Sequence, residues 1–197
     1  VKLLGAVCRE GEISPLQETT GQTLLGQGLY RTHQLQPEAM ARTTEIIGKY
    51  VARGRQAAAD RIRIIATSAA READNAAEFA AAVERTTGLP LEIISGDHEA
   101  RLVFAGVLTG RPETPRDLLL IDVGGGSTEF ILGNRDGLRF SGSYPLGTVR
   151  LLDSHPHSDP PLPAELSAHR AYVRQFLAEN LAARLRPHLD ESRTRGL

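Results

Sequence analysis

The stretch DLLLIDVGGGSTEFILG, residues 117–133, places three consecutive glycines between two strongly apolar runs. An acidic residue, Asp122, stands just before the glycines, and a second one, Glu129, follows shortly after them. A surface turn needs one or two glycines, and it does not usually interrupt the most apolar segment of a chain. The glycines therefore pose a choice between a tight hairpin and a loop that binds phosphate.

The composition is that of an ordinary globular chain, with 41% hydrophobic residues among 197. A formal net charge of −1 excludes the global basic field that a protein held on nucleic acid by phosphate contacts would carry. The lone cysteine, Cys8, excludes an intrachain disulfide and favours a reducing compartment. Because no apolar run approaches the ~20 residues of a membrane span, we expect a cytoplasmic protein with no membrane and no nucleic acid as partner.

Apolar periodicity predicts strands and helices that alternate along the chain. The helix expected at 96–110 should place Leu102, Val103 and Val107 on its inward face. The prolines of RPETPRD, residues 111–117, indicate a connector, and NRDG, residues 134–137, indicates a hairpin turn. We expect strands at 1–8, 13–20, 61–69, 91–95, 117–123, 128–133 and 138–147, and helices at 37–54, 74–90, 96–110 and 164–189.

The residues that follow the glycines decide between the known phosphate loops. A dinucleotide fingerprint needs spaced glycines that open a helix, but residues 124–126 are contiguous and the next six, STEFIL, favour a strand. A Walker loop needs a lysine after its last glycine, and the two lysines, Lys2 and Lys49, lie far away. What is left is a glycine turn between strands, which is either a hairpin with solvent-facing acids or an anion site of backbone amides with hydroxyls from Ser127 and Thr128.

The two acidic residues beside the glycines need an explanation if the loop binds phosphate. A carboxylate repels phosphate, so this arrangement makes sense when a hard divalent cation lies between them. Asp122 and Glu129 are therefore the candidate ligands of Mg²⁺ or another divalent cation, held partly through water.

Five stretches together resemble the exopolyphosphatase and guanosine pentaphosphate phosphohydrolase (Ppx/GppA) family of the actin-like superfamily. They follow the family's order and cover most of the chain, and the set is far more specific than any one of them. The stretches are LGQGL (25–29), ATSAAREADN (66–75), ISGDHEARLVFAGV (94–107), LLLIDVGGGSTEF (118–130) and YPLGTVRL (144–151).

The resemblance implies a role for each matching residue. Glu99 corresponds to the family's catalytic base, while Asp122 and Glu129 position the metal or the attacking water. From the residues alone, Glu99 is better explained as a first-turn acid that stabilises a helix, and Arg71 is equally a surface arginine at a helix start. The implied phosphate-binding residues are Gly124, Gly125, Gly126, Ser127, Thr128, Arg71 and Gly147.

The resemblance also implies the fold, which is the α/β, ribonuclease H-like fold of the actin-like ATPases. It has mixed sheets flanked by helices and two domains around a cleft. We expect residues 1–115 to form the first domain and residues 116–197 to begin the second. Relatives start with a strand and a phosphate loop of the type Asp-x-Gly-Thr-Asn-Ser, and Val1 stands where that loop would just have ended. Both domains are therefore expected to be incomplete.

The activity implied is the hydrolysis of a terminal phosphoanhydride, assisted by Mg²⁺. Inorganic polyphosphate and guanosine pentaphosphate are the partners that the family offers, and a homodimer is a further expectation. Two other functions stay open, which are a module that binds polyphosphate or the nucleotide without turnover and an actin-like ATP-dependent kinase.

Overall fold

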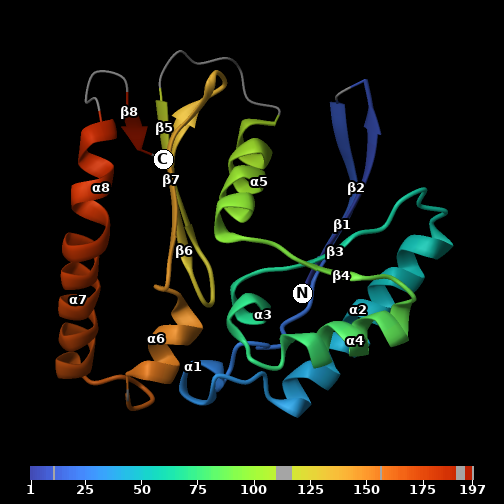
Figure 1. Cartoon of the computed structure of the whole chain (residues 1–197), viewed down its shortest axis with the longest axis horizontal. Coiled ribbons are helices and arrows are strands. Elements are labelled where there is room, and N and C mark those ends of the chain that lie inside the picture. The colour runs from blue at the N-terminus through green and yellow to red at the C-terminus, as the bar shows by residue number, and fades with distance from the viewer. Residues whose placement is uncertain (11, 110–116, 156, 190–193, 197) are drawn as a thin grey trace. The chain divides into compact units, whose positions relative to one another are not determined.

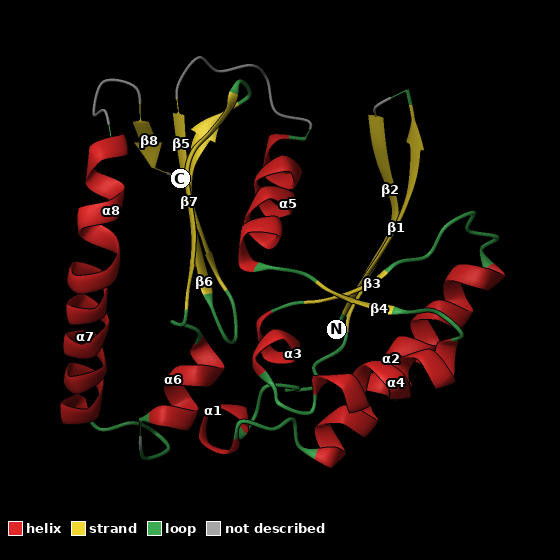
Figure 2. Ribbon diagram, viewed as in Figure 1, coloured by secondary structure: helices red, strands yellow, loops and turns green. Residues whose placement is uncertain are grey.

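The computed structural model divides into two compact units, Val1–Ile94 and Ser95–Leu197 (Figures 1 and 2). The predicted domain boundary between residues 115 and 116 lies outside the described residues. The helix expected at 96–110 belongs to the second unit because it packs on that unit's sheet. The structure describes residues 1–10, 12–109, 117–155, 157–189 and 194–196.

The first unit combines a β-hairpin with a parallel strand pair and helices. Its elements are β1 Lys2–Arg9, β2 Glu12–Thr20, α1 Leu29–Thr32, α2 Pro37–Gln56, β3 Ile64–Ala66, α3 Ser68–Glu72, α4 Ala76–Thr87 and β4 Leu91–Ile93. β1 and β2 are antiparallel, whereas β3 and β4 are parallel and joined through α3 and α4. α2 packs on α4, and Ile47, Val51, Phe79 and Val83 form the centre of this core. The strand, helix, strand order expected from the sequence is confirmed.

The second unit is a mixed sheet with the strand order β7-β6-β5-β8. Its elements are α5 Gly96–Leu108, β5 Asp117–Val123, β6 Thr128–Asn134, β7 Gly137–Tyr144, α6 Thr148–Ser154, α7 Pro163–Leu177, a π-helical turn Ala178–Ala182, α8 Ala183–Leu185, a 3₁₀ turn Arg186–His188 and β8 Thr194–Gly196. β5, β6 and β7 are antiparallel neighbours, and β8 runs parallel to β5. The glycine turn between two strands, expected from the STEFIL segment, is confirmed.

α5 covers one face of this sheet (Figure 1). Ala100 and Phe104 are buried against Leu118 and Ile131 of the strands, and Val103 packs beside them. The predicted inward position of Leu102 is wrong, because its side chain is 42% exposed. The helix is rotated so that the larger Phe104 side chain meets the sheet, which buries more apolar surface.

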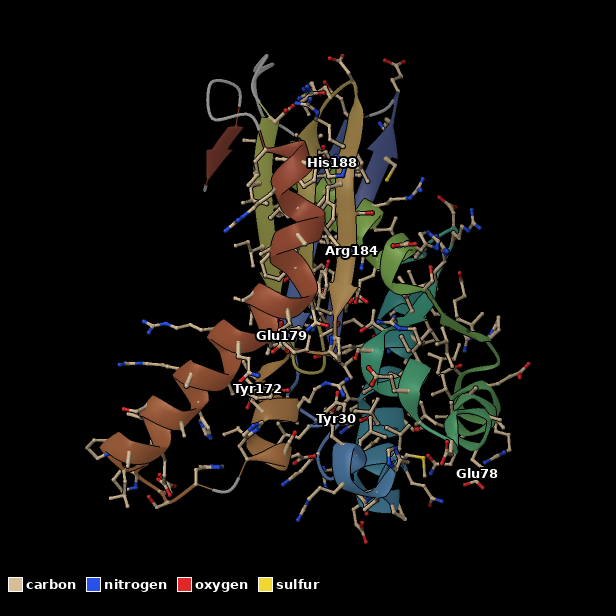
Figure 3. All side chains as sticks on the ribbon, turned by 60° about the vertical axis from the view of Figure 1, so that its left-hand side comes forward. Tyr30, Glu78, Tyr172, Glu179, Arg184 and His188 are labelled. Carbon is tan, nitrogen blue, oxygen red and sulfur yellow. The ribbon has the colours of Figure 1, made fainter. Side chains whose placement is uncertain are left out.

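The opposite face of the sheet is covered by the long C-terminal helix. Figure 3 shows Arg184 and His188 of this helix lying over the sheet, where the Arg184 guanidinium carbon is 5.9 Å from the Tyr144 ring centre and the His188 ring is 5.6 Å from that of Phe140. The segment expected as one continuous helix at 164–189 contains the π-helical turn and ends in the 3₁₀ turn. The buried contacts on this face come from Phe130, Leu132, Phe140, Tyr144, Leu181 and Leu185. None of the described helices combines the length and the hydropathy that a bilayer crossing requires.

Candidate active site

The two acidic residues of the glycine stretch lie side by side on the sheet. Asp122 on β5 is directly opposite Glu129 on β6, and Glu129 is directly opposite Ser143 on β7. Residues directly opposite in an antiparallel pair have Cβ atoms about 5 Å apart and share one face. Since strand side chains alternate, Glu129 lies on the same face as Ile131, which is the face that α5 covers.

The orientation of α5 brings Glu99 to the same end of that face. The Arg135 Nη2 atom, at the β6–β7 turn, donates to the carbonyl of Leu108 at 3.2 Å and so ties the last turn of α5 to that end. α5 has 13 residues and is therefore about 20 Å long, close to the length of β6. Its first turn, which carries half-buried Glu99, consequently lies toward the end at which the glycine loop joins β5 to β6.

The glycine loop, residues 124–127, has its carbonyl groups tied to the start of α6. The Gly124 carbonyl accepts from the Thr148 amide at 3.0 Å, and the Gly125 carbonyl accepts from the Val149 amide at 2.8 Å and the Arg150 amide at 3.1 Å. Arg150 adds its Nε, which donates to the Gly126 carbonyl at 2.7 Å. Three consecutive loop carbonyls thus point toward α6.

The tied carbonyls determine where the loop amides point. In a trans peptide the N–H of the next residue points opposite to the carbonyl, so the amides of Gly125, Gly126 and Ser127 point away from α6. Among the described residues, the Gly125 and Gly126 amides have no hydrogen-bond partner. Adjacent amides that point to one side form the kind of concave nest that binds an anion.

Gly147, which precedes α6, is required by the close approach of this helix to the loop. A Cβ atom added at Gly147 would overlap the carbonyl group of Gly125 and the carbonyl carbon of Gly126. Its backbone is extended, with φ −121°, so the constraint is space and not conformation. Gly147 therefore supports the loop from behind, and its predicted contact with phosphate stays a prediction.

The hydroxyls of the loop are directed into the protein. Ser127 Oγ donates to Glu129 Oε1 at 2.8 Å, and Thr128 Oγ1 donates to the carbonyl of Leu146. Both side chains are buried. The prediction that these hydroxyls bind phosphate stays a prediction, and the structure places the backbone amides of the loop in the better position for it.

The donor set at Asp122 and Glu129 fits a hard divalent cation. Magnesium is usually held in proteins by one or two carboxylates together with water and substrate phosphate, and these two residues supply the carboxylates. Within the described ranges, no three His, Cys, Asp or Glu side chains are grouped as a ready metal site. The remaining ligands would therefore be water and phosphate oxygens.

Arg71, the other predicted phosphate ligand, belongs to the first unit. Its Nη1 donates to the carbonyl of Ile94 at 2.7 Å, which connects α3 to the residue after β4. Asn75, from the same motif, holds the backbone of Leu35 through its side-chain amide. These contacts give both residues a structural part, and the phosphate role of Arg71 stays a prediction.

Two residues of the site were missed from the sequence or left without a role. Ser143 could not have been found from the NRDG turn alone, because the pairing of Asn134 with Gly137 would place Gly142 opposite Glu129, and a register shift between Leu132 and Gly133 brings Ser143 there instead. Arg150 lies in the YPLGTVRL stretch without a predicted role, and its contact with the Gly126 carbonyl gives it a structural one. No local pattern signals that contact, since 24 positions separate the two residues.

These features define a mixed α/β protein with a glycine-rich hairpin loop next to paired carboxylates. The family model of the Ppx/GppA phosphatase family matches residues 6–195, and the chain belongs to that family. The fold class expected from the sequence is confirmed by the solved structures of relatives that share it.

The similar proteins are longer than this chain. Exopolyphosphatase 2 of Mycobacterium tuberculosis is 36% identical over 179 residues, which are 88% of this chain and 56% of that protein. The crystal structure of an exopolyphosphatase from Cytophaga hutchinsonii has a TM-score of 0.84 at 26% identity, over 90% of this chain and 57% of that one. The crystal structure of the Ppx/GppA family member of Aquifex aeolicus has a TM-score of 0.69 at 30% identity, over 90% of this chain and 58% of that one. The chain thus spans a little over half the length of these relatives.

Proposed function

We propose that the full-length protein hydrolyses the terminal phosphoanhydride of inorganic polyphosphate. The observation that carries this proposal is the loop whose carbonyls are tied to α6, with Asp122 and Glu129 on the adjoining face of the sheet and Glu99 in the first turn of α5, the helix that covers this face. Similar proteins from Mycobacterium tuberculosis and Cytophaga hutchinsonii carry the name exopolyphosphatase, which supports the polymer as substrate. Guanosine pentaphosphate is the second candidate substrate, because its terminal phosphate offers the same bond.

The loop amides bind and orient the terminal phosphate in this proposal. The outward N–H groups of Gly125 and Gly126 donate to its oxygens and lower the charge that the attacking water meets. When bound, a divalent cation held by Asp122 and Glu129 would neutralise further charge on the phosphate oxygens. The loop keeps this geometry without the ligand because α6 and Arg150 hold it from behind.

Glu99 is the proposed general base. It accepts a proton from water as the water oxygen bonds to the terminal phosphorus, and the bond from phosphorus to the bridging oxygen breaks. The products are orthophosphate and a chain shorter by one phosphate. A carboxylate in the first turn of α5 is held at a fixed place, since Ser95 caps the helix by accepting from the His98 amide at 3.2 Å.

The test is Glu99→Gln in the full-length protein, measured by phosphate release from long-chain polyphosphate. We expect kcat to fall by about 10²–10⁴, the range for removal of a general base, with KM changed less than about threefold. Asp97→Asn is the matched control, because Asp97 lies in the same helical turn. It removes the same negative charge from the positive end of the helix dipole as Glu99→Gln does. The control should keep kcat within about threefold.

Other results would redirect the assignment. Phosphate release by Glu99→Gln at the parent rate would show that Glu99 is not the base. A parent protein that binds polyphosphate without releasing phosphate would instead support a binding module. Transfer of the ATP γ-phosphate to an acceptor would support a kinase.

A further inference from the structure

The carboxylate of Glu129 is held by two serine hydroxyls on a single oxygen. Its Oε1 accepts from Ser127 Oγ at 2.8 Å and from Ser143 Oγ at 2.7 Å. Glu129 is only 1% exposed, so bulk water could not readily replace either hydroxyl as a hydrogen-bond donor. The two serines come from different places, one from the glycine loop and one from the neighbouring strand β7.

This arrangement leaves the second carboxylate oxygen for another partner. With both hydroxyls on Oε1, the carboxylate plane is fixed by donors from two directions. Glu129 Oε2 accepts no hydrogen bond from the described residues. This oxygen is not among the enclosed side-chain atoms without a partner in the described residues, so it keeps some contact with solvent. A largely buried carboxylate with Asp122 opposite it favours a cation as the partner of that oxygen.

We infer that Ser143 is a positioning residue, which holds Glu129 Oε1 so that Oε2 faces the divalent cation. The inference rests on the proposed function and adds a residue to its site. Ser143 reaches the reaction only through Glu129, so its loss acts on the metal and on the turnover that depends on it. Partners of this kind, which orient a metal ligand, typically change metal affinity or activity by about 10–100-fold when removed.

The hydroxyl, and not the bulk of the side chain, carries this role. Ser143→Ala removes the donor and leaves the strand backbone unchanged. Ser143→Thr restores a hydroxyl on a residue that strands favour. Ser141→Ala is the matched control, because Ser141 lies on the same strand and face two positions earlier, opposite Ile131 and away from Glu129.

The experiment measures Mn²⁺ binding to the full-length protein by electron paramagnetic resonance, next to steady-state phosphate release. We expect Ser143→Ala to weaken Mn²⁺ binding by about tenfold or more and to lower kcat at fixed Mg²⁺, with KM for polyphosphate nearly unchanged. Ser143→Thr should recover most of the binding, and Ser141→Ala should equal the parent. A structural role alone would lower stability without this selective loss of metal affinity.

The outcomes separate the inference from the proposed function. Parent-like Mn²⁺ binding by Ser143→Ala, in a parent that releases phosphate, overturns the role of Ser143 and leaves the hydrolase proposal standing. A parent that binds no Mn²⁺ also overturns it. A parent that binds Mn²⁺ but releases no phosphate overturns the hydrolase proposal, and the binding series still decides the role of Ser143.

Discussion

The two turns at opposite ends of β6 are built in different ways. The β6–β7 turn is closed by residues within it, since Asn134 Oδ1 accepts from the Asp136 amide at 2.8 Å and Gly137 adopts a φ of +150°. The glycine loop at the other end has one internal bond, from the Gly124 amide to the Ser127 carbonyl at 2.9 Å. The carbonyls of Gly124, Gly125 and Gly126 accept hydrogen bonds from residues 148–150 of α6.

The difference separates a turn that only connects strands from one that presents a surface. A local turn satisfies its own backbone groups, and its shape follows from its own residues. The glycine loop turns its carbonyls toward α6, and this leaves the Gly125 and Gly126 amides for a ligand. We therefore expect substitutions in or near the β6–β7 turn to alter stability alone. Substitutions in α6, which holds the glycine loop, should alter activity.

Gly147→Ala should have the largest effect. The added methyl group overlaps the Gly125 carbonyl, so either α6 or the loop must move. A displacement of about 1 Å at a reacting group can cost about 10²-fold in rate, and we expect at least that loss in kcat. Phosphate release and thermal unfolding of the full-length protein check it.

Gly106→Ala is the control for Gly147→Ala. It adds the same methyl group to an exposed position of α5 where nothing lies within 4 Å. It should keep full activity and raise stability by about 0.5–1 kcal/mol, the usual gain for Gly to Ala in a helix. Parent-like turnover by Gly147→Ala would contradict the view that α6 shapes the loop.

Arg139→Met should have the next largest effect, at the end of the sheet near the β6–β7 turn. Asp117 is fully buried, accepts from Asn134 Nδ2 at 2.9 Å and forms an ion pair with Arg139. Removal of the arginine leaves a buried carboxylate without its cation, and we expect the free energy of unfolding to fall by about 2–3 kcal/mol. The value is placed below the usual range of about 3–5 kcal/mol for a buried pair because the Arg139 side chain is partly exposed.

Urea denaturation measures this loss, and Arg139→Met with Asp117→Asn should recover part of it because the buried charge is gone. The kcat of the folded variant should equal that of the parent. A loss of kcat without a loss of stability would mean that the two ends of β6 are not separate in function.

Gly137→Ala should have a smaller effect, confined to the local turn. A Cβ atom at Gly137 meets nothing within 4 Å, so the cost is only that of a φ that residues with side chains rarely adopt. We expect a loss of about 1–2 kcal/mol in the free energy of unfolding and no change in turnover. Chemical denaturation next to a phosphate-release assay tests this, and a fall in kcat would count against it.

The smallest expected effect is that the stability of the first turn of α7 depends on pH. The pKa of Glu165 is held below its usual value by the Leu162 amide at 2.7 Å, and also by the hydroxyl and amide of Ser158. Because the folded state lowers this pKa, the stabilisation is present above the unfolded value and is lost as pH falls through the folded value.

The protection factors of the Ser158, Leu162 and Leu166 amides, which compare the observed exchange rate with the intrinsic rate at the same pH, should therefore fall as the Glu165 carboxylate takes up a proton on the acid side of the ordinary glutamate range. Glu165→Ala should show the lower protection factors at every pH and lose this dependence. Protection factors that do not change with pH in the parent would contradict the role of the ionised carboxylate.

The sequence was enough to predict the parts of the site that depend on local pattern. Three contiguous glycines followed by STEFIL predicted a strand after the loop, because β-branched and aromatic residues disfavour the alternative helix. The acids on either side of the glycines, Asp122 and Glu129, were predicted to flank one ligand, and the strand register places them opposite each other. The family motifs added Glu99, whose position on α5 has no local signature beyond a first-turn acid.

The parts that failed or were missed depend on contacts between distant residues. The inward position of Leu102 was wrong because the rotation of α5 is set by the fit of Phe104 against Ile131. The phosphate role of Ser127 and Thr128 stays a prediction, but the sequence did not show that their hydroxyls donate to Glu129 and to the Leu146 carbonyl. A hydroxyl can rotate to any acceptor within reach, so its partner cannot be read from sequence.

By itself the sequence determined the order of strands and helices, the glycine loop between two strands, the paired carboxylates and the family. The strands, the helices and the loop follow from side-chain period and backbone preference, which act over a few residues, whereas the family follows from the set of motifs. The tertiary structure alone decided which way the loop peptides face, because α6 binds their carbonyls from more than twenty positions away. It also decided that Ser143 holds Glu129, since a hydrogen bond between strands exists only once the sheet has formed.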